Sequence, residues 1–337
     1  MTDPSPGPTA DVAKRPLRLG TLGVGRIVHR GLVPGVATST RVELVATASE
    51  RPGAASAAGL PGVAIDGYQN LLDRGDVDAV YVPARGHDHA RWVLQAAAAG
   101  KHVLCEKPLG LNIAEAELMA AACRDAHVVL FETFMWRHHD RSLDIRRRVR
   151  AGEIGTLRHI AFDFAFQIDP DDWRLDPAQG GGAIYDIGCY GINAARFFTG
   201  EEPADVDCDS RLHASGADLS SRIGLTFPGG TLATVACSFE RPLRCDLRLL
   251  GSDGDLWVPD MALPPDEAHA VLTSAGGEPQ TIRYPSCEQY GRQLDAFAAA
   301  VDAGTLIDPA EDGLANMRVI ERAYAAAGRD VRPGVQT

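Results

Sequence analysis

The sequence lacks the features that would assign it to a membrane, to nucleic acid or to secretion. No stretch approaches the 18 consecutive apolar residues typical of a membrane-spanning helix. Its 33 Lys and Arg are outnumbered by 45 Asp and Glu, for a net charge of -12, whereas a duplex-binding protein normally presents a basic face. Residues 1–15 are rich in Pro, Ser and Thr without the apolar segment of a signal peptide. These absences predict a cytoplasmic protein whose partners include neither membrane nor nucleic acid.

Close pairs of metal-binding side chains are also missing. The 7 cysteines are scattered, with an odd total and no C-x-x-C pair, which favours reduced thiols over a disulfide framework or a zinc site. The adjacent His138 and His139 would point to different faces of a helix or strand. The sequence therefore predicts no metal site.

Strand and helix patterns alternate over the first 138 residues. A helix is predicted from about His89, and the capping-box pair Asn112 and Glu115 predicts a second one to about residue 126. Short apolar runs predict strands at 17–22, 42–48, 78–83, 103–106 and 128–131. This alternation predicts a doubly wound parallel sheet of the Rossmann type. We expect a flexible tail over residues 1–15 and a dinucleotide-binding domain over residues 16–138.

The turn after the first predicted strand carries a dinucleotide fingerprint. It reads Gly23-Val24-Gly25-Arg26-Ile27-Val28, a G-x-G-x-x-V pattern. Gly23 permits the tight turn, and Gly25 lets the backbone approach a pyrophosphate at a helix N-terminus. Val28 stands where glycine or alanine would allow closer helix packing.

The residues after the second predicted strand indicate which dinucleotide is bound. Ser49 can donate a hydrogen bond to a 2′-phosphate and Arg51 can pair with it. Glu50 would repel that phosphate unless it points away, and could instead accept from the ribose hydroxyl of NAD. NADP is therefore the predicted cofactor, with NAD as the alternative.

After about residue 155 the apolar period changes to two. Predicted strands of this kind are 160–166, 223–227, 233–239 and 247–249, and predicted helices are 182–199, 290–301 and 314–324. Successive strands joined by short turns predict a mainly antiparallel sheet. We expect an α+β domain over residues 139–337 that follows the dinucleotide-binding domain.

Three residues carry the predicted chemistry. Lys107 follows a buried strand that stops at a proline, and ligands bind beyond the carboxyl ends of parallel strands. Tyr190 lies four residues beyond Asp186, so both can face one cleft. A phenol, with a pKa of about 10, serves at neutral pH only if a nearby cation lowers that pKa, and Lys107 is the candidate. The alternatives are a solvent-facing lysine and a packed aromatic residue.

Several segments together resemble the glucose–fructose oxidoreductase / inositol dehydrogenase (Gfo/Idh/MocA) family, over nearly the whole chain past the tail. The matching segments are Gly23-Val24-Gly25, Glu106-Lys107-Pro108, residues 132–137, residues 152–155 and residues 180–190. Many members have His where this chain has Tyr190, and the Tyr form is similar to the branch with xylose dehydrogenases and deoxysugar ketoreductases. Gly86 departs from the family, which often has Asn there. The resemblance implies a sugar-derived substrate and a homodimer or tetramer formed through the open face of the second sheet.

The predicted function is hydride transfer between a nicotinamide and a sugar or sugar-like hydroxyl or ketone. Lys107 would polarise the reacting oxygen, Tyr190 would exchange its proton, and Asp186 would orient the lysine or the substrate. The predicted cofactor-binding residues, several of them implied by the resemblance alone, are Gly23, Gly25, Arg26, Ile27, Ser49, Arg51, Tyr68, Pro83, His89, Glu106, Lys107, Trp173 and Arg174. Two alternatives stay open: a nucleotide-linked ketosugar reductase of deoxysugar biosynthesis, and a non-catalytic dinucleotide-binding sensor.

Overall fold

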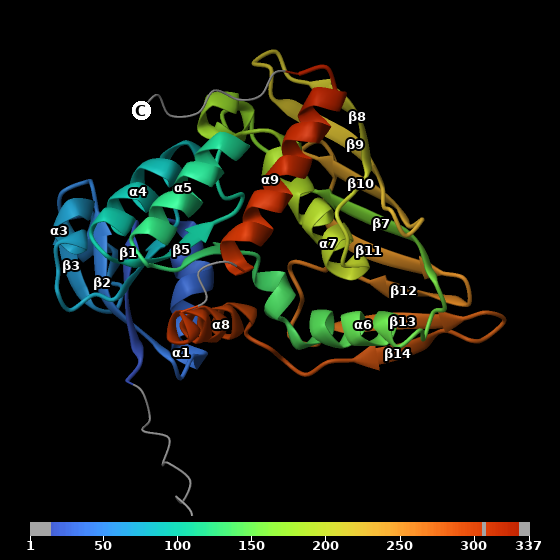
Figure 1. The fold of residues 1–337 in the computed structure, drawn as a ribbon, viewed down its shortest axis with the longest axis horizontal. Coiled ribbons are helices and arrows are strands. Elements are labelled where there is room, and N and C mark those ends of the chain that lie inside the picture. The colour runs from blue at the N-terminus through green and yellow to red at the C-terminus, as the bar shows by residue number, and fades with distance from the viewer. Residues whose placement is uncertain (1–14, 305–307, 330–337) are drawn as a thin grey trace, which may run out of the picture.

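Two β-sheets organise the chain (Figure 1). The computed structural model describes residues 15–304 and 308–329, so the predicted tail lies outside the described residues except for Arg15. The first sheet has six parallel strands in the order β3-β2-β1-β4-β5-β6, and the second has eight in the order β14-β13-β12-β11-β7-β10-β9-β8. The predicted fold class, a Rossmann-type sheet followed by a mainly antiparallel one, is confirmed. Within the described ranges, no helix combines the length and the apolar character needed to cross a bilayer.

The first sheet is buried on both faces, which explains its nearly continuous apolar strands. Its strands are β1 (Leu17–Leu22), β2 (Val42–Ser49), β3 (Val63–Asp66), β4 (Ala79–Val82), β5 (His102–Glu106) and β6 (Leu130–Thr133). Its helical segments are η1 (Val28–Leu32), α1 (Val33–Thr38), α2 (Ala54–Ala58), α3 (Tyr68–Leu72), α4 (Gly86–Ala98) and α5 (Ile113–Asp125). In β4, Val80 and Val82 pack in the core with α4 and α5, whereas Ala79 and Tyr81 face the core that includes η1.

Local sequence signals set the longer of these elements, whereas the short helical segments η1, α1, α2 and α3 were not predicted. The capping box is confirmed, because Asn112 Oδ1 accepts from the Glu115 amide at 2.8 Å. Strand β3 was not predicted, since its four residues lie at an exposed edge with little apolar pattern. Strand β6 begins at Leu130, two residues later than the apolar run suggests.

The second sheet is centred on β7 (Leu157–Ala165). This strand pairs antiparallel with β11 (Arg244–Gly251) and parallel with β10 (Leu232–Ser238). The remaining strands are β8 (Asp205–Leu212), β9 (Asp218–Thr226), β12 (Gly254–Val258), β13 (His269–Ser274) and β14 (Gln280–Arg283). Helix α7 (Cys189–Thr199) lies close against one face, where a Cβ on Gly191 would meet Phe162 Cδ1 at 2.5 Å. Helices α6 (Asp140–Arg150) and α9 (Asp308–Ala326) cover the same side of the molecule (Figure 1).

Helix α8 (Gln289–Ala303) returns from the second sheet to the first (Figure 1). Leu294 and Phe297 join the core of Leu19 and Val28 on the first sheet. Helix α8 therefore completes a hydrophobic core that residues near the start of the chain begin. The predicted domain boundary at residues 138 and 139 stays a prediction.

Candidate active site

A pocket of about 300 Å³ lies at the carboxyl ends of β1 and β2, around the glycine turn. Gly23 has φ +145°, and a Cβ there would lie 3.2 Å from Pro83 Cγ and 3.5 Å from Tyr68 Oη. A Cβ on Gly25 would meet nothing within 4 Å, so its backbone faces open space. The turn thus offers the close backbone approach that a dinucleotide pyrophosphate requires.

Ser49, Glu50 and Arg51, the residues predicted to distinguish NADP from NAD, line this pocket. Glu50 Oε1 accepts a hydrogen bond from the Tyr68 amide at 2.8 Å, which draws this carboxylate to the start of α3. Ser49 Oγ accepts from the Arg51 amide at 3.2 Å. Among the described residues, Arg51 has no carboxylate within ion-pair distance and is exposed at the pocket. Its charge is therefore available to a 2′-phosphate, while Glu50 already has a partner.

Lys107 and Arg174 hold Asp186 between them. Lys107 Nζ lies 3.1 Å from Asp186 Oδ1 and donates to the Asp186 carbonyl at 2.7 Å. Arg174 Nε lies 2.6 Å from Asp186 Oδ2. The three side chains are only 12 to 14 % exposed. Lys107 directly follows β5, and Asp186 comes from the π-helical turn η5 (Ile184–Gly188), which begins the predicted helix 182–199.

The charges of this triplet are fixed at neutral pH. Burial opposes ionisation of Asp186, but Lys107 and Arg174 outweigh it and lower the pKa of Asp186 to about 2. Burial likewise opposes the charge of Lys107, but Asp186 prevails and raises the pKa of Lys107 above its usual value. Lys107 is therefore a permanent cation at the carboxyl end of β5.

The ring of Tyr190, and not its hydroxyl, faces this cation. Lys107 Nζ lies over the Tyr190 ring, 4.9 Å from its centroid, and the hydroxyl donates to Met135 Sδ at 3.7 Å. Phe134 and Phe164 contact the ring edge-to-face, at 5.4 and 5.6 Å. Burial raises the pKa of Tyr190 well above its usual value.

The expectation that Lys107 lowers the pKa of Tyr190 is therefore wrong. The ammonium group faces the ring and is paired with Asp186, while the hydroxyl donates to the Met135 thioether. At neutral pH the phenol is protonated. Such a group can give a proton to a developing alkoxide, whereas it is a poor base in its resting state.

Two tyrosines near Glu106 escaped the sequence reasoning. Tyr81, from β4, donates to Glu106 Oε1 at 2.6 Å. Tyr290, from α8, packs where a Cβ on Gly31 would lie 2.6 Å from its Cε1. Burial first and then Glu106 raise the pKa of Tyr290. Tyr290 reaches this place because α8 packs against the first sheet. In the sequence it belongs to the predicted helix 290–301, and nothing there indicates a site.

Some of the other predicted cofactor residues line the pocket, and others pack in the structure around it. Tyr68 and Pro83 line the pocket, Arg26 is exposed beside it, and Ile27 is half-buried. His89 is 1 % exposed. Its ring nitrogens face the carbonyls of Ala84 and Pro108, at 3.0 and 3.1 Å.

His89 therefore connects the β4–α4 turn to the loop after Lys107, and offers no exposed ring atom to a cofactor. Trp173 lies between two cations, with Arg85 Cζ at 5.3 Å and Arg174 Cζ at 4.8 Å from its ring. These two contacts place Trp173 between the first sheet and the Asp186 cluster.

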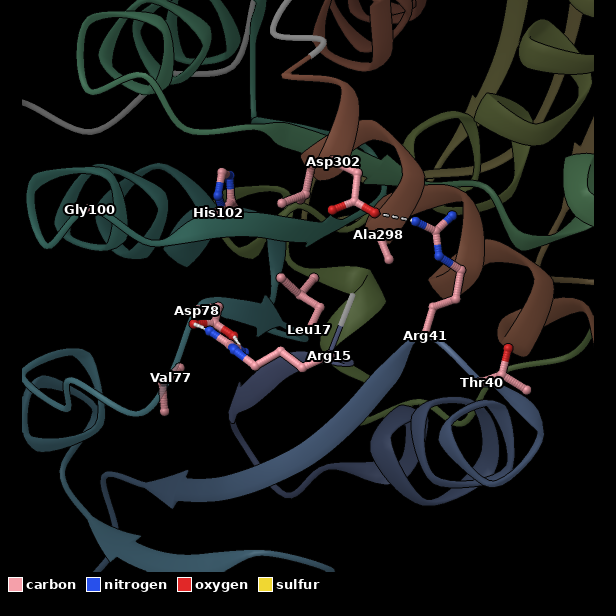
Figure 2. A pocket seen from close by; sticks show the side chains of 11 residues that line it. Arg15, Leu17, Thr40, Arg41, Val77, Asp78, Gly100, His102, Ala298 and Asp302 are labelled. Atoms are coloured by element: carbon pink, nitrogen blue, oxygen red, sulfur yellow. Dashed lines mark hydrogen bonds and ion pairs between the residues drawn. The ribbon is translucent and has the colours of Figure 1, made fainter. Parts of the chain in front are cut away.

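A larger cavity, of about 870 Å³, lies at the opposite end of the first sheet (Figure 2). Its charged side chains are largely occupied with each other: Arg15 Nη1 lies 2.6 Å from Asp78 Oδ2, and Arg41 Nη2 lies 2.5 Å from Asp302 Oδ2. It lies at the amino ends of the strands, away from the glycine turn and Lys107. The smaller pocket and the Lys107 cluster therefore form the candidate active site.

Two family models match the chain. The model described as an oxidoreductase family with an NAD-binding Rossmann fold covers residues 17–134. The GFO/IDH/MocA C-terminal domain covers residues 142–257.

Relatives match over nearly the full length. A dTDP-3,4-didehydro-2,6-dideoxy-alpha-D-glucose 3-reductase of Saccharopolyspora spinosa is 35% identical, over 92% of this chain and 95% of its own. A D-xylose 1-dehydrogenase (NADP(+)) of Haloferax volcanii is 34% identical, over 92% of this chain and 96% of its own. A tyrosine-to-phenylalanine variant of KijD10, a 3-ketoreductase from Actinomadura kijaniata, has been solved with TDP-benzene and NADP. It superimposes with a TM-score of 0.87 at 31% identity, over 94% of this chain and 99% of its own.

Proposed function

This chain belongs to the Gfo/Idh/MocA family of oxidoreductases, and from that membership we propose that it reduces the ketone of a nucleotide-linked sugar with NADPH. It is an NAD(P)-dependent sugar oxidoreductase, like the ketoreductases and sugar dehydrogenases it resembles. The proposal narrows this activity to one direction and one substrate class.

The observation that carries the proposal is the place of Lys107, which pairs with Asp186 beside the Tyr190 ring, and the raised pKa of Tyr190 favours the reductive direction. Burial keeps the phenol neutral, and Asp186 keeps Lys107 cationic. A ketone oxygen between these two groups would meet a proton donor and a positive charge, both of which stabilise the alkoxide that forms during reduction. An alcohol to be oxidised would instead need a base, which the resting site does not present.

Lys107, Asp186 and Tyr190 have separate roles in the proposed reduction. When bound, the nicotinamide supplies the hydride. Lys107 attracts the carbonyl oxygen, and Asp186 fixes the direction of its ammonium group. Tyr190 gives its proton to the oxygen, which is an easy exchange because its present acceptor, the Met135 thioether, is weak. A proton from solvent then restores the phenol.

NADP as the cofactor is supported by the pocket around the glycine turn. Arg51 and Ser49 would hold the 2′-phosphate, while Glu50 stays on the Tyr68 amide. The open side of Gly25 would admit the pyrophosphate.

A second candidate function is the oxidation of a free aldose. A D-xylose dehydrogenase matches this chain almost as well as the ketoreductase does, at 34% against 35% identity. In that reaction the same residues would act in reverse, at the higher pH that deprotonates Tyr190.

Absorbance of the reduced nicotinamide distinguishes the candidates. The purified protein is mixed with NADPH and an enzymatically generated dTDP-linked 3-ketosugar, and in parallel with NADP and a panel of free aldoses that includes D-xylose. We expect NADPH consumption with the nucleotide-linked ketone and slow or no reduction of NADP. Rapid oxidation of an aldose without response to the ketone would replace the proposal by the second candidate. Cofactor binding without any turnover would indicate the sensor.

Three broader expectations belong to the same proposal. The exposed face of the second sheet carries charged and apolar side chains, Leu232 among them at 49 % exposure, and we propose that it forms a homodimer or tetramer. We place the enzyme in the cytoplasm, and the boundary between its domains at residues 138 and 139. Light scattering of the purified protein measures the assembly.

A further inference from the structure

Arg85 occupies a tightly packed place between the two halves of the chain. It is the residue before α4, and the turn behind it is packed tightly. A Cβ on Gly86 would collide with Tyr185 Oη, and one on Gly180 would lie 3.3 Å from the Gly86 Cα. Tyr185 in turn donates to the Gly110 carbonyl at 2.9 Å. The backbone of Arg85 is thus fixed against both the second half of the chain and the loop after Lys107.

The Arg85 side chain reaches from this turn to residues of the second half of the chain. Its Nη1 donates to Gln179 Oε1, and its Cζ lies over the Trp173 ring at 5.3 Å. Gln179 is itself oriented, because its Nε2 donates to Asp176 Oδ2 at 2.7 Å. The guanidinium is therefore held in one place while it stays exposed to solvent.

The charge of Arg85 is not neutralised within the described residues, where no carboxylate lies within ion-pair distance of it. The two neighbouring cations differ in this respect. Lys107 pairs with Asp186, and Arg174 pairs with both Asp186 and Asp172. A protein with a net charge of -12 repels anions overall, so an anionic substrate depends on local cations of this kind.

We propose that Arg85 binds the diphosphate of a nucleotide-linked sugar, an inference that rests on the proposed function. A chain of contacts runs from Arg85 through Trp173 and Arg174 to Asp186, which holds Lys107 at the reacting oxygen. The sugar would lie along this line of residues, with its diphosphate at Arg85. The guanidinium turns from Gln179, a neutral acceptor, to a charged one, which binds it more strongly.

The diphosphate of the cofactor is the other source of this chemistry, and the geometry argues against it. The preceding residue, Ala84, lines the dinucleotide pocket, but Arg85 does not. Its guanidinium extends instead toward residues 173–179 of the other half of the chain.

Calorimetric titration of dTDP into the NADP-saturated protein tests the assignment, with NADP titrated separately. The Arg85→Ala variant should bind dTDP roughly 10- to 100-fold more weakly, the range for losing hydrogen bonds to a charged group, and should bind NADP unchanged. Arg85→Gln, which keeps a polar side chain, should show a similar loss. The matched control is Arg91→Ala, which removes an exposed arginine of α4 that is stacked on Trp92 at 4.5 Å; it should change neither titration.

Each other outcome overturns the assignment in a distinct way. If Arg85→Ala weakens NADP as much as dTDP, the arginine serves the cofactor. If dTDP binds the variant as tightly as the wild type, Arg85 has no part in substrate binding, although the proposed function stands. If the wild type itself does not bind dTDP, the nucleotide-linked substrate is excluded, and the role of Arg85 with it.

Discussion

Replacing Asp186 by asparagine tests whether one carboxylate organises the site. Its two oxygens accept from Lys107 at 3.1 Å and from Arg174 at 2.6 Å, and its side chain is 13 % exposed. The amide side chain of the Asp186→Asn variant would keep the shape but lose the charge, so Lys107 would lose its carboxylate partner and Arg174 would keep only Asp172. Both stability and chemistry should respond.

The size of the effect follows from burial. Removing one partner of a buried ion pair costs about 3–5 kcal/mol, and here two cations lose the same partner. The pKa of Lys107 should fall below 10.5, its value in water, because burial then acts without the opposing effect of Asp186. A basic limb should therefore enter the pH profile of kcat, as Lys107 loses its proton within the accessible range.

Urea unfolding and the pH dependence of kcat measure the two effects, and Asp172→Asn is the matched control. Asp172 also contacts Arg174, at 3.2 Å, but it is 21 % exposed and does not contact Lys107. An asparagine there can still accept from the Arg174 amide as a cap, so stability should change by about 1 kcal/mol or less. Equal unfolding midpoints and equal pH profiles for the two variants would refute the reasoning.

Three further predictions follow from single residues. Tyr190→Phe should lower kcat by roughly 100-fold or more, with little change in melting temperature because the lost hydroxyl donates to a weak acceptor, the Met135 thioether; a preserved rate would remove Tyr190 from proton transfer. Arg51→Ala should weaken NADP by about 1.5–3 kcal/mol and leave NAD unchanged, as fluorescence titrations of both cofactors would show. Glu132 is buried, and burial and then Asp312 raise its pKa from 4.5 to about 8. The folded state thus favours its neutral form, so the unfolding free energy should fall as pH rises from 4.5 to 8, by at most about 1.4 kcal/mol per pH unit, and Glu132→Gln should abolish this slope in urea titrations.

Much of the fold could be predicted because its signals are local. The apolar run 17–22, the capping box at Asn112 and the period of two in 160–166 are each confirmed by the element found there. These patterns reflect burial on one or both faces, which a strand or helix imposes on its own residues. Strand β3 escaped because an exposed edge imposes no such pattern.

The candidate site was harder to predict because its properties depend on how the side chains are oriented as well as on which residues lie close together. Lys107 and Tyr190 do lie together, but the ammonium faces the ring rather than the hydroxyl. The sign of the pKa change of Tyr190 is therefore set by burial, which sequence spacing does not reveal. Arg85 was passed over for the same reason, because its partners Gln179 and Trp173 come from the other half of the chain.

Because α8 packs on the first sheet, it constrains the order in which this protein folds during synthesis. Leu294 and Phe297 cover one face of the first sheet, and Asp295 Oδ1 accepts from Ser39 Oγ at 2.6 Å. A nascent chain that has released only its first 138 residues still lacks this cover, and its apolar face must wait for about 160 residues more, the span that typically makes a whole domain. Folding of the cofactor-binding half is thus completed late, after the substrate-binding half has emerged from the ribosome.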